Sequence, residues 1–544
     1  MTWLGELRQR WLDQPETVVL AGPQPLRARD MLGRVGAFQA ALEQAGVHTG
    51  DRVCLVAANG PGWIAADLAC LAQGVILVPF DPRQEAATTA ELARQAGVAL
   101  VLHDADGPRG VDAPALPLAD VAGSAEWSHP RDPDAELPAT ILYTSGTTGT
   151  PKGAILSHGN LEFMLDCATT RLAELTGLAW GEEHALHYLP LCYAGSRVVV
   201  LAALRRGATL TLLSDPRQLA TELEAASPHY LLNVPLVLER FRAAALEGVA
   251  ARGPRAAGLL AGALQAHRDP PRGLRGLRAR GVRALARRTV LPKIRGRFGS
   301  RLVGLICGSA PLSVACQEFY AALGIPIYQG YGLTETTALC TLDRPGEIRP
   351  GYVGTALPGV ELEVDEEGEV LTRGPHVFAG YWKNQAASEA ALTPQGWFRT
   401  GDHGEFDEAG RLKVLGRRNA VLVLQSGHNV PPEPIEETLR EAIGAGAQVC
   451  LSGHGKPHLS AVVAGEGLER AAVDAAIRAY NDSVAGPRRV QGFHLAPEPF
   501  SETDGTLTSN LKLRRRAIHE RYGRQLEAIY ASGPTVRAAG GGAA

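Results

Sequence analysis

Glycines, hydroxyl side chains and a lysine are concentrated in residues 143–153, which read YTSGTTGTPKG. Glycine lets backbone N–H groups approach a phosphate closely, hydroxyl groups donate to its oxygens, and a lysine adds positive charge. The run ATILYTS at 139–145 enters this segment as a strand would. The pattern therefore predicts a phosphate-binding loop that follows a strand.

Two common kinds of phosphate loop do not fit these residues. A Walker loop requires a lysine that opens a helix and is followed by Ser or Thr for Mg²⁺, whereas here Pro151 precedes Lys152 and Gly153 follows it. The dinucleotide fingerprint begins with a Gly-x-Gly pair, which Gly146 and Gly149 do not supply. The loop therefore belongs to neither of these two classes of phosphate-binding site.

The loop resembles the T-S-G-T-T-G-x-P-K-G signature of the adenylate-forming superfamily, which comprises acyl-CoA synthetases, luciferases and peptide-synthetase adenylation domains. Further segments resemble that family's motifs in the expected order and cover most of the chain: LPLCYAGSR (189–197), GSAPLS (308–313), YQGYGLTETT (328–337), WFRTGD (397–402), GRRNAVLVLQSGHNVPPEPIE (416–436) and TLTSNLKLRR (506–515).

The resemblance implies an ATP-dependent enzyme with two half-reactions in one site. A carboxylate attacks the ATP α-phosphate to form acyl-AMP and pyrophosphate, and a thiol then displaces AMP. Both steps develop negative charge, so positioning and positive charge are expected to carry the catalysis. The family's catalytic lysine corresponds to Lys512, with Arg417 donating to ribose or phosphate. Glu335 is expected to hold Mg²⁺ together with Thr144, since this hard cation prefers oxygen ligands.

The same resemblance assigns the nucleotide site. Tyr331 is expected to stack on adenine, with Gly308, Ser309 and Ala310 on its other side, and Asp402 to accept the ribose hydroxyls. Other residues expected to bind the nucleotide or coenzyme A are Thr144, Ser145, Gly146, Thr147, Thr148, Gly149, Lys152, Gln329, Gly330, Gly332, Thr334 and Gly427.

The chain departs from the family pattern at two of the implied positions. Tyr193 stands where relatives usually have His, beside the acyl pocket that Gly308 and Gly330 are expected to line. The hinge of the C-terminal domain falls on Asn419, where relatives more often have Asp or Lys. Asn tolerates unusual backbone angles, so a hinge is still expected there.

Two segments favour the long-chain acyl-CoA synthetase branch of the family. LPKIRGRFGSRLVGLICGSAPLS at 291–313 and LTSNLKLRR at 507–515 resemble segments of that branch. An aliphatic, fatty-like acid is the first interpretation of the substrate, and a cyclic, aromatic or terpenoid acid is the alternative. The acceptor is coenzyme A, or in the alternative a carrier protein or another nucleophile. A non-catalytic relic is a third hypothesis, which the intact Lys512, Glu335, Asp402 and Arg417 disfavour.

The pattern of elements predicts an α/β fold. Apolar runs at 52–58, 74–80, 99–104 and 230–235 alternate with helical stretches such as 31–46 and 86–97, as in a helix-covered, largely parallel sheet. Residues 352–416 read as a small antiparallel β-unit. We expect a large N-terminal domain over 1–417, a small mobile α+β domain over 418–530 and a disordered tail over 531–544.

Composition narrows the class of protein. With 45% apolar residues and a net charge of −3, the 544 residues predict a protein with an ample core and no attraction to nucleic acid. Eight scattered cysteines without a C-x-x-C pair indicate buried, reduced thiols, and no membrane-spanning run or signal peptide is evident, so a cytoplasmic location is expected. No oligomeric state is predicted.

One segment is strongly basic. Residues 251–301 contain fourteen Lys and Arg and a single acid, Asp269. The simpler interpretation is an amphipathic helical hairpin whose arginines face water. The alternative is a surface for an anionic partner such as coenzyme phosphates, an acyl carrier protein or a lipid surface, which would allow peripheral membrane contact.

Overall fold

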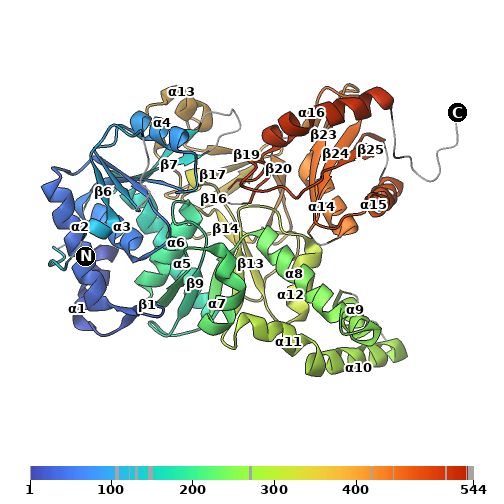
Figure 1. Cartoon of the computed structure of the whole chain (residues 1–544), viewed down its shortest axis with the longest axis horizontal. Coiled ribbons are helices and arrows are strands. Elements are labelled where there is room, and N and C mark those ends of the chain that lie inside the picture. The colour runs from blue at the N-terminus through green and yellow to red at the C-terminus, as the bar shows by residue number, and fades with distance from the viewer. Residues whose placement is uncertain are drawn as a thin grey trace.

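The chain folds into a large N-terminal part built on three sheets and a smaller C-terminal part (Figure 1). This computed structural model describes residues 2–104, 110–121, 123–128, 133–144, 151–268, 273–417, 421–444, 446–484, 486–508, 511–533 and 536, without the side chains of 273–279 and 429. The arrangement confirms the predicted α/β class, with helix-covered mixed sheets followed by a small α+β segment.

The first large sheet has seven strands in the order β18-β8-β7-β4-β3-β5-β6. They are β3 (Arg52–Val56), β4 (Ile76–Phe80), β5 (Leu100–His103), β6 (Ala115–Pro117), β7 (Pro138–Thr144), β8 (Lys152–Ser157) and β18 (Gly380–Tyr381). The central pairs are parallel, and β4 is buried along its whole length, which explains its unbroken apolar run. Helices α2 (Ala28–Gln44), α3 (Pro61–Gln73) and α4 (Ala86–Ala96) alternate with these strands, as predicted.

The second large sheet has nine strands in the order β15-β14-β13-β12-β11-β9-β10-β1-β2. They are β1 (Val18–Ala21), β2 (Leu26–Arg27), β9 (His184–His187), β10 (Thr209–Leu212), β11 (Tyr230–Asn233), β12 (Gly304–Cys307), β13 (Ile327–Tyr331), β14 (Thr341–Leu342) and β15 (Thr355–Ala356). Because β11, β12 and β13 are parallel, their carboxyl ends meet at one edge. The GSAPLS and YGLTET segments follow β12 and β13 and are therefore brought together.

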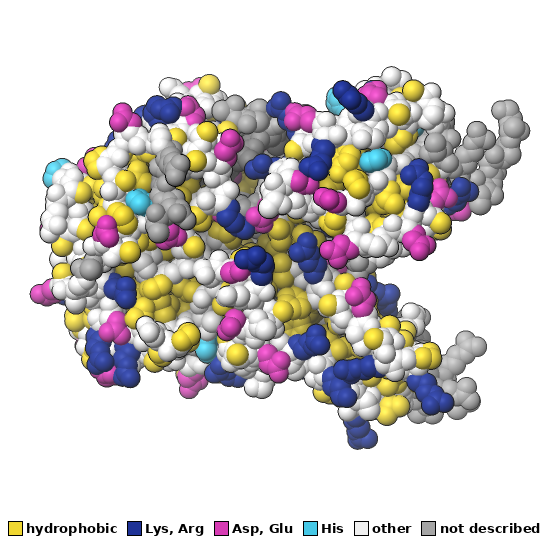
Figure 2. Space-filling view, viewed as in Figure 1, with side chains coloured by type: hydrophobic (Ala, Val, Ile, Leu, Met, Phe, Trp, Pro, Cys, Tyr) yellow, Lys and Arg dark blue, Asp and Glu magenta, His cyan; other side chains and the backbone are white. Residues whose placement is uncertain are grey.

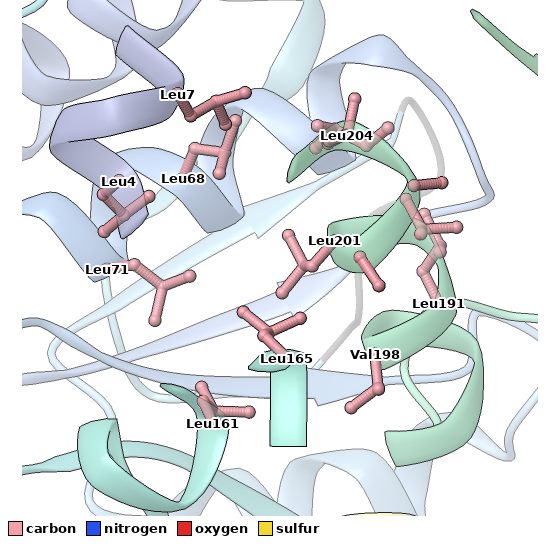
Figure 3. Packing of buried hydrophobic residues seen from close by; sticks show 14 of the residues in the cluster. Leu4, Leu7, Leu68, Leu71, Leu161, Leu165, Leu191, Val198, Leu201 and Leu204 are labelled. Atoms are coloured by element: carbon pink, nitrogen blue, oxygen red, sulfur yellow. The ribbon is translucent and has the colours of Figure 1, made fainter. Parts of the chain in front are cut away.

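A large apolar core lies where helices of the two sheets meet. Figure 3 shows leucines of α1 (Trp3–Asp13), α3, α5 (His158–Thr176) and α6 (Ala194–Arg205) packed toward one another. Inside this core, Arg197 donates to Asp67 over 2.9 Å (Nε to Oδ2), with both side chains at most 2% exposed. The arginine of LPLCYAGSR therefore joins α6 to α3 through a buried ion pair.

The basic segment forms a helical hairpin that projects from the molecule (Figure 1). It consists of α9 (Pro254–Arg268) and α10 (Gly273–Thr289), flanked by α7 (Leu219–Ala226), α8 (Pro235–Ala250), α11 (Leu291–Arg295) and α12 (Val314–Ala322). Leu260, Ala263 and Ala286 are buried, while arginines such as Arg287 and Arg288 are exposed. Figure 2 shows Lys and Arg side chains gathered on this projection, so the predicted amphipathic hairpin is confirmed.

The predicted β-unit is a four-stranded antiparallel sheet in the order β16-β17-β19-β20. Its strands are β16 (Glu361–Val364), β17 (Glu369–Arg373), β19 (Phe398–Phe406) and β20 (Leu412–Arg417), and α13 (Gln385–Ala391) lies between β18 and β19 in the chain. Two short strands of the same region, β15 and β18, instead join the two large sheets. The β-unit is thus tied to both sheets.

The C-terminal part contains a three-stranded sheet, β23-β24-β25, and a two-stranded one, β21-β22. Its elements are β21 (Leu422–Val423), β22 (Asn429–Val430), α14 (Pro432–Ile443), β23 (Gln448–Ser452), β24 (Leu459–Ala464), α15 (Arg470–Ser483), β25 (Val490–Leu495) and α16 (Arg515–Ser532). The predicted boundary at 417/418 coincides with the end of β20. Most of the predicted tail, 531–544, lies outside the described residues.

All eight cysteines are free and buried, as predicted. Burial raises the pKa of each of these thiols, including Cys54, Cys192 and Cys450. Among the described helices, none combines the length and apolar character that crossing a membrane requires.

Candidate active site

Three of the predicted nucleotide residues meet at the edge of the β-unit. Asp402 on β19 lies directly opposite Arg417 on β20, and the Arg417 Nε is 2.8 Å from the Asp402 Oδ1. Tyr331, the last residue of β13, donates its hydroxyl to the Asp402 Oδ2 over 2.7 Å. Asp402 is only 4% exposed. The carboxylate is therefore held from two sides.

The pKa shifts of Tyr331 and Asp402 favour hydrogen bonds among Tyr331, Asp402 and Arg417. Burial raises the pKa of Tyr331 well above its ordinary value, and the Asp402 carboxylate adds to that shift, so the hydroxyl stays protonated and donates. Burial also raises the pKa of Asp402, while the Arg417 guanidinium opposes the rise. A ribose hydroxyl that reached Asp402 would meet an acceptor with little competing water.

Lys512 comes to this group from the C-terminal part. It lies in a tight loop in which Leu507 bridges Leu513 and the Thr508 N–H donates to the Lys512 carbonyl over 2.8 Å. The surrounding protein and the Arg417 cation lower the pKa of Lys512 to about 8, and the Asp402 carboxylate opposes this shift. Solvent nevertheless reaches the Lys512 side chain. These observations place the lysine close enough to Arg417 and Asp402 to feel their charges, while its side chain stays accessible to solvent.

The predicted phosphate loop joins two antiparallel strands. Thr144 ends β7 and Lys152 begins β8, and the two residues are paired in the ladder. The Lys152 Nζ lies 5.1 Å from the centre of the Tyr381 ring, and the Tyr381 hydroxyl donates to the Glu335 Oε1 over 2.9 Å. Lys152 and the buried Glu335 are thus connected through Tyr381. The predicted loop residues Ser145, Gly146, Thr147, Thr148 and Gly149 lie outside the described residues.

Close packing explains three of the predicted glycines. A Cβ on Gly332 would lie 2.2 Å from the carbonyl oxygen of Ala338, and one on Gly330 would lie 2.8 Å from the Leu339 side chain. Gly308 faces Gly330 across the neighbouring strand ends, where an added Cβ would lie 3.1 Å from the Gly330 carbonyl. Side chains at these positions would displace the loops that carry Tyr331 and Glu335.

The segment after β12 is exposed and partly strained. Ser309 and Ala310 are exposed, and Ser309 has a φ of 73°, an unusual conformation for a residue other than glycine. Such conformations persist only where the surrounding structure imposes them, and they cluster at ligand sites. The role of this segment as a wall of the adenine site stays a prediction.

Several predicted residues lie outside this group. The Gln329 side chain donates to the Tyr352 carbonyl over 2.8 Å and is buried. Thr334 begins a short 3₁₀ helix, Thr334–Thr336, that carries Glu335. Gly427 lies in an exposed turn between β21 and β22, where its N–H donates to Leu424. The predicted hinge, Asn419, lies outside the described residues.

Tyr193 lies beside an acidic residue that sequence reasoning missed. It precedes α6, and its hydroxyl is 3.5 Å from the Oδ2 of Asp81, a side chain only 5% exposed. Asp81 also accepts from Arg83. A signal was present, because the DPR segment follows β4 at the carboxyl edge of a parallel sheet, where ligand-binding residues commonly lie. Tyr381 was missed as well, and the sequence around it carries no signal of its role.

The arrangement fits a magnesium nucleotide. A buried carboxylate, Glu335, and the hydroxyl of Thr144 are oxygen ligands of the kind that Mg²⁺ prefers. Arg417 and Lys512 supply positive charge beside Asp402, and Lys152 supplies it beside Tyr381, the partner of Glu335. Together these groups are suited to bind a polyphosphate and to stabilise charge that develops on it.

Comparison with known proteins shows the family of the chain. Residues 7–382 match the family described as AMP-binding enzyme. The chain is 32% identical over 538 residues to the long-chain-fatty-acid–CoA ligase FadD15 of Mycobacterium bovis, covering 89% of each chain. It is 29% identical to the human long-chain-fatty-acid–CoA ligase 1, covering 90% of this chain and 80% of that one.

Solved structures share the fold. O-succinylbenzoate coenzyme A synthetase (MenE) from Bacillus subtilis, in complex with AMP, is similar with a TM-score of 0.72 and 20% identity, covering 95% of this chain and 97% of that one. ATP-bound MatB from Rhodopseudomonas palustris is similar with a TM-score of 0.72 and 23% identity, covering 95% and 99%. Since the matched family extends over more than half of the chain, this protein belongs to the AMP-binding enzyme family.

Proposed function

We propose that this protein joins a fatty acid to coenzyme A at the expense of ATP, through an acyl-AMP intermediate. The observation that carries the proposal is the convergence of Lys512, from the C-terminal part, on the Asp402–Arg417 pair of the N-terminal part. A cation brought to a nucleotide-binding carboxylate from a separate part of the chain is suited to the transfer of an adenylyl group.

In the first half-reaction the acid's carboxylate attacks the ATP α-phosphate, the bond to pyrophosphate breaks, and acyl-AMP forms. Asp402 holds the ribose hydroxyls, with Tyr331 and Arg417 fixing its two oxygens. Lys512 draws the two anions together and offsets the negative charge that develops between them. Glu335 and Thr144 would hold Mg²⁺, which would neutralise charge on the phosphates when bound.

In the second half-reaction the coenzyme A thiol attacks the acyl carbon, and AMP leaves. Among the described contacts, the exposed turn with Gly427 has hydrogen bonds only within the C-terminal part, to Leu424 and through Gln425 to the Gly455 and Lys456 carbonyls, and none to Asp402 or Lys512. This arrangement supports a rotation of the C-terminal domain, 418–530, about Asn419 between the two half-reactions. The rotation would withdraw Lys512 and bring Gly427 to the site.

The relatives favour a fatty acid as the substrate. FadD15 and the human ligase carry long-chain fatty acids in their names, and both align with most of this chain. The MenE likeness, at 20% identity, concerns the fold. The alternative is an acyl-AMP ligase that delivers an aryl, cyclic or terpenoid acid to a carrier protein. We place the enzyme in the cytoplasm, with the basic α9–α10 hairpin available for peripheral contact with an anionic surface.

The test is mass spectrometry of reactions with ATP, Mg²⁺ and a panel of fatty, aryl and polycyclic acids, with and without coenzyme A. The proposal expects acyl-CoA and AMP from fatty acids, with product dependent on coenzyme A. Acyl-AMP that accumulates although coenzyme A is present would instead support the carrier-protein alternative, and thioester from aryl acids alone would refute the fatty substrate.

A matched pair of variants tests the role of Lys512. Lys512→Ala is expected to abolish acyl-AMP formation and to leave ATP binding nearly intact. Lys456→Ala is the control, because Lys456 is another partly exposed lysine of the C-terminal part, paired with Glu527 over 2.7 Å. Equal adenylation by the two variants would show that Lys512 is not the catalytic lysine.

A further inference from the structure

We propose that an ion pair between Arg83 and Glu502 docks the C-terminal part for the first half-reaction and thereby positions Lys512. The proposal rests on the function proposed above. The Arg83 Nη1 and the Glu502 Oε2 are 2.9 Å apart, and the pair joins the first sheet of the N-terminal part to the segment that precedes the Lys512 loop. Arg83 and Glu502 are positioning residues in this proposal, because neither belongs to the group around Asp402.

Arg83 is held in place before it reaches Glu502. It follows β4, and its Nε and Nη2 donate to the two oxygens of Asp81 over 3.0 and 2.8 Å. The Arg83 backbone N–H donates to the same carboxylate over 2.9 Å. This bidentate contact orients the planar guanidinium and leaves Nη1 directed at Glu502. The arginine therefore presents a fixed cation at the surface of the N-terminal part.

Glu502 is connected rigidly to the catalytic loop. The Leu507 N–H donates to the Ser501 carbonyl over 2.9 Å, closing a turn around Glu502. The Thr508 N–H donates to the Lys512 carbonyl over 2.8 Å, and Lys512 returns a backbone hydrogen bond to the Thr508 hydroxyl over 3.0 Å. The turn and the loop thus form one hydrogen-bonded unit. Fixing Glu502 on Arg83 fixes the place to which Lys512 is delivered.

The pair also lies beside the predicted acid pocket. Asp81, which holds Arg83, is the carboxylate next to the Tyr193 hydroxyl. The docking contact therefore shares Asp81 with the predicted acid pocket and is linked through the turn at Glu502 to the Lys512 loop. A rotation that withdraws Lys512 for thioester formation would carry Glu502 away from Arg83, so the pair is expected to serve the first half-reaction alone.

The expected loss of rate in the Glu502 variants follows from how far the two side chains of the pair are exposed to water. The Arg83 side chain is 42% exposed and that of Glu502 27% exposed, and ion pairs of this kind contribute modestly in water. Glu502→Gln is expected to slow acyl-AMP formation by about threefold to fivefold. Glu502→Arg places two cations together and is expected to slow it by about tenfold or more. Glu502→Asp keeps the charge and is expected to retain roughly half of the rate or more.

The experiment measures the two half-reactions separately in the full-length protein. Pyrophosphate release with ATP and a fatty acid reports the first, and transfer from preformed fatty acyl-AMP to coenzyme A reports the second. The Glu502 variants are expected to slow the first and to leave the second and the KM for ATP within about twofold. Glu361→Gln, which breaks the exposed Arg373–Glu361 pair of the β-unit, is the control and is expected to change neither rate.

Two results would overturn the docking role. One is a Glu502→Arg variant that releases pyrophosphate as fast as the wild type. The other is an equal loss in both half-reactions, which would indicate general destabilisation. A wild-type protein that neither releases pyrophosphate nor forms thioester with any acid would refute the proposed function itself, so the two failures are distinguishable.

Discussion

The lowered pKa of Lys512 predicts that acyl-AMP formation falls as the solution becomes alkaline. The lysine acts as a cation, and its pKa is about 8 because the surrounding protein and Arg417 disfavour the charged form. Below this pKa the ammonium group is present, and above it the charge is lost, so the first half-reaction declines as the pH rises through about 8.

The expected decline in rate follows from the titration curve of Lys512. With a pKa of about 8, the protonated share of Lys512 is about 90% near pH 7 and about 10% near pH 9, which is roughly a ninefold decline. Asp402 opposes the shift, so Asp402→Asn is expected to move the midpoint to lower pH. Arg417→Met removes a neighbouring cation and is expected to move it to higher pH. Only the pH of the midpoint is compared in these two variants, since Asp402 and Arg417 are also proposed to bind the nucleotide.

The assay is kcat/KM for ATP in pyrophosphate release, because this quantity reports ionisation in the free enzyme. Lys512→Arg is the control, since a guanidinium stays charged over the whole range and any residual activity is expected to be independent of pH up to about pH 9. A wild-type profile that stays level through the same range would refute the link between the lysine's charge and the first half-reaction.

Two further perturbations test the scaffold and the nucleotide site. Arg197→Met leaves the buried Asp67 carboxylate unpaired and is expected to lower the free energy of unfolding by about 3–5 kcal/mol, whereas adding Asp67→Leu is expected to restore most of it. Urea unfolding of the single and double variants checks this, and equal stability of the two would contradict it. Tyr331→Phe removes the 2.7 Å hydrogen bond to Asp402 and is expected to raise the KM for ATP by about tenfold, with kcat within about twofold. Steady-state kinetics beside a Tyr352→Phe control measure this effect, and an unchanged KM would count against the role of the hydroxyl.

The fold could be predicted wherever local pattern and final structure agree. The apolar runs that became β3, β4 and β5 are buried in a parallel sheet, and such strands are apolar throughout. The antiparallel β-unit was predictable because short, polar, glycine-containing turns link β16 to β17 and β19 to β20. The exceptions, β15 and β18, have two residues each and depend on partners elsewhere in the chain.

The candidate site was predictable only where a motif marked it. Asp402 and Lys512 would otherwise read as a turn residue and part of a solvated basic patch. Tyr381 and Arg83 were missed because their roles depend on Glu335 and Glu502, which are distant in sequence. Local sequence patterns do not indicate such a contact, because only the folded chain brings the two partners together. The positive φ of Ser309 is likewise a property of the folded chain.

The buried cysteines have a consequence for the chemistry of the protein. Acyl-AMP is a strong electrophile toward thiolates, and a thiolate on the enzyme itself would be a competing acceptor. All eight thiols are buried, and burial raises the pKa of each, even that of Cys192 beside Tyr193. The protein therefore keeps its own sulfur protonated and shielded while it handles an activated acyl group, which protects it from self-acylation and leaves the intermediate to the incoming acceptor.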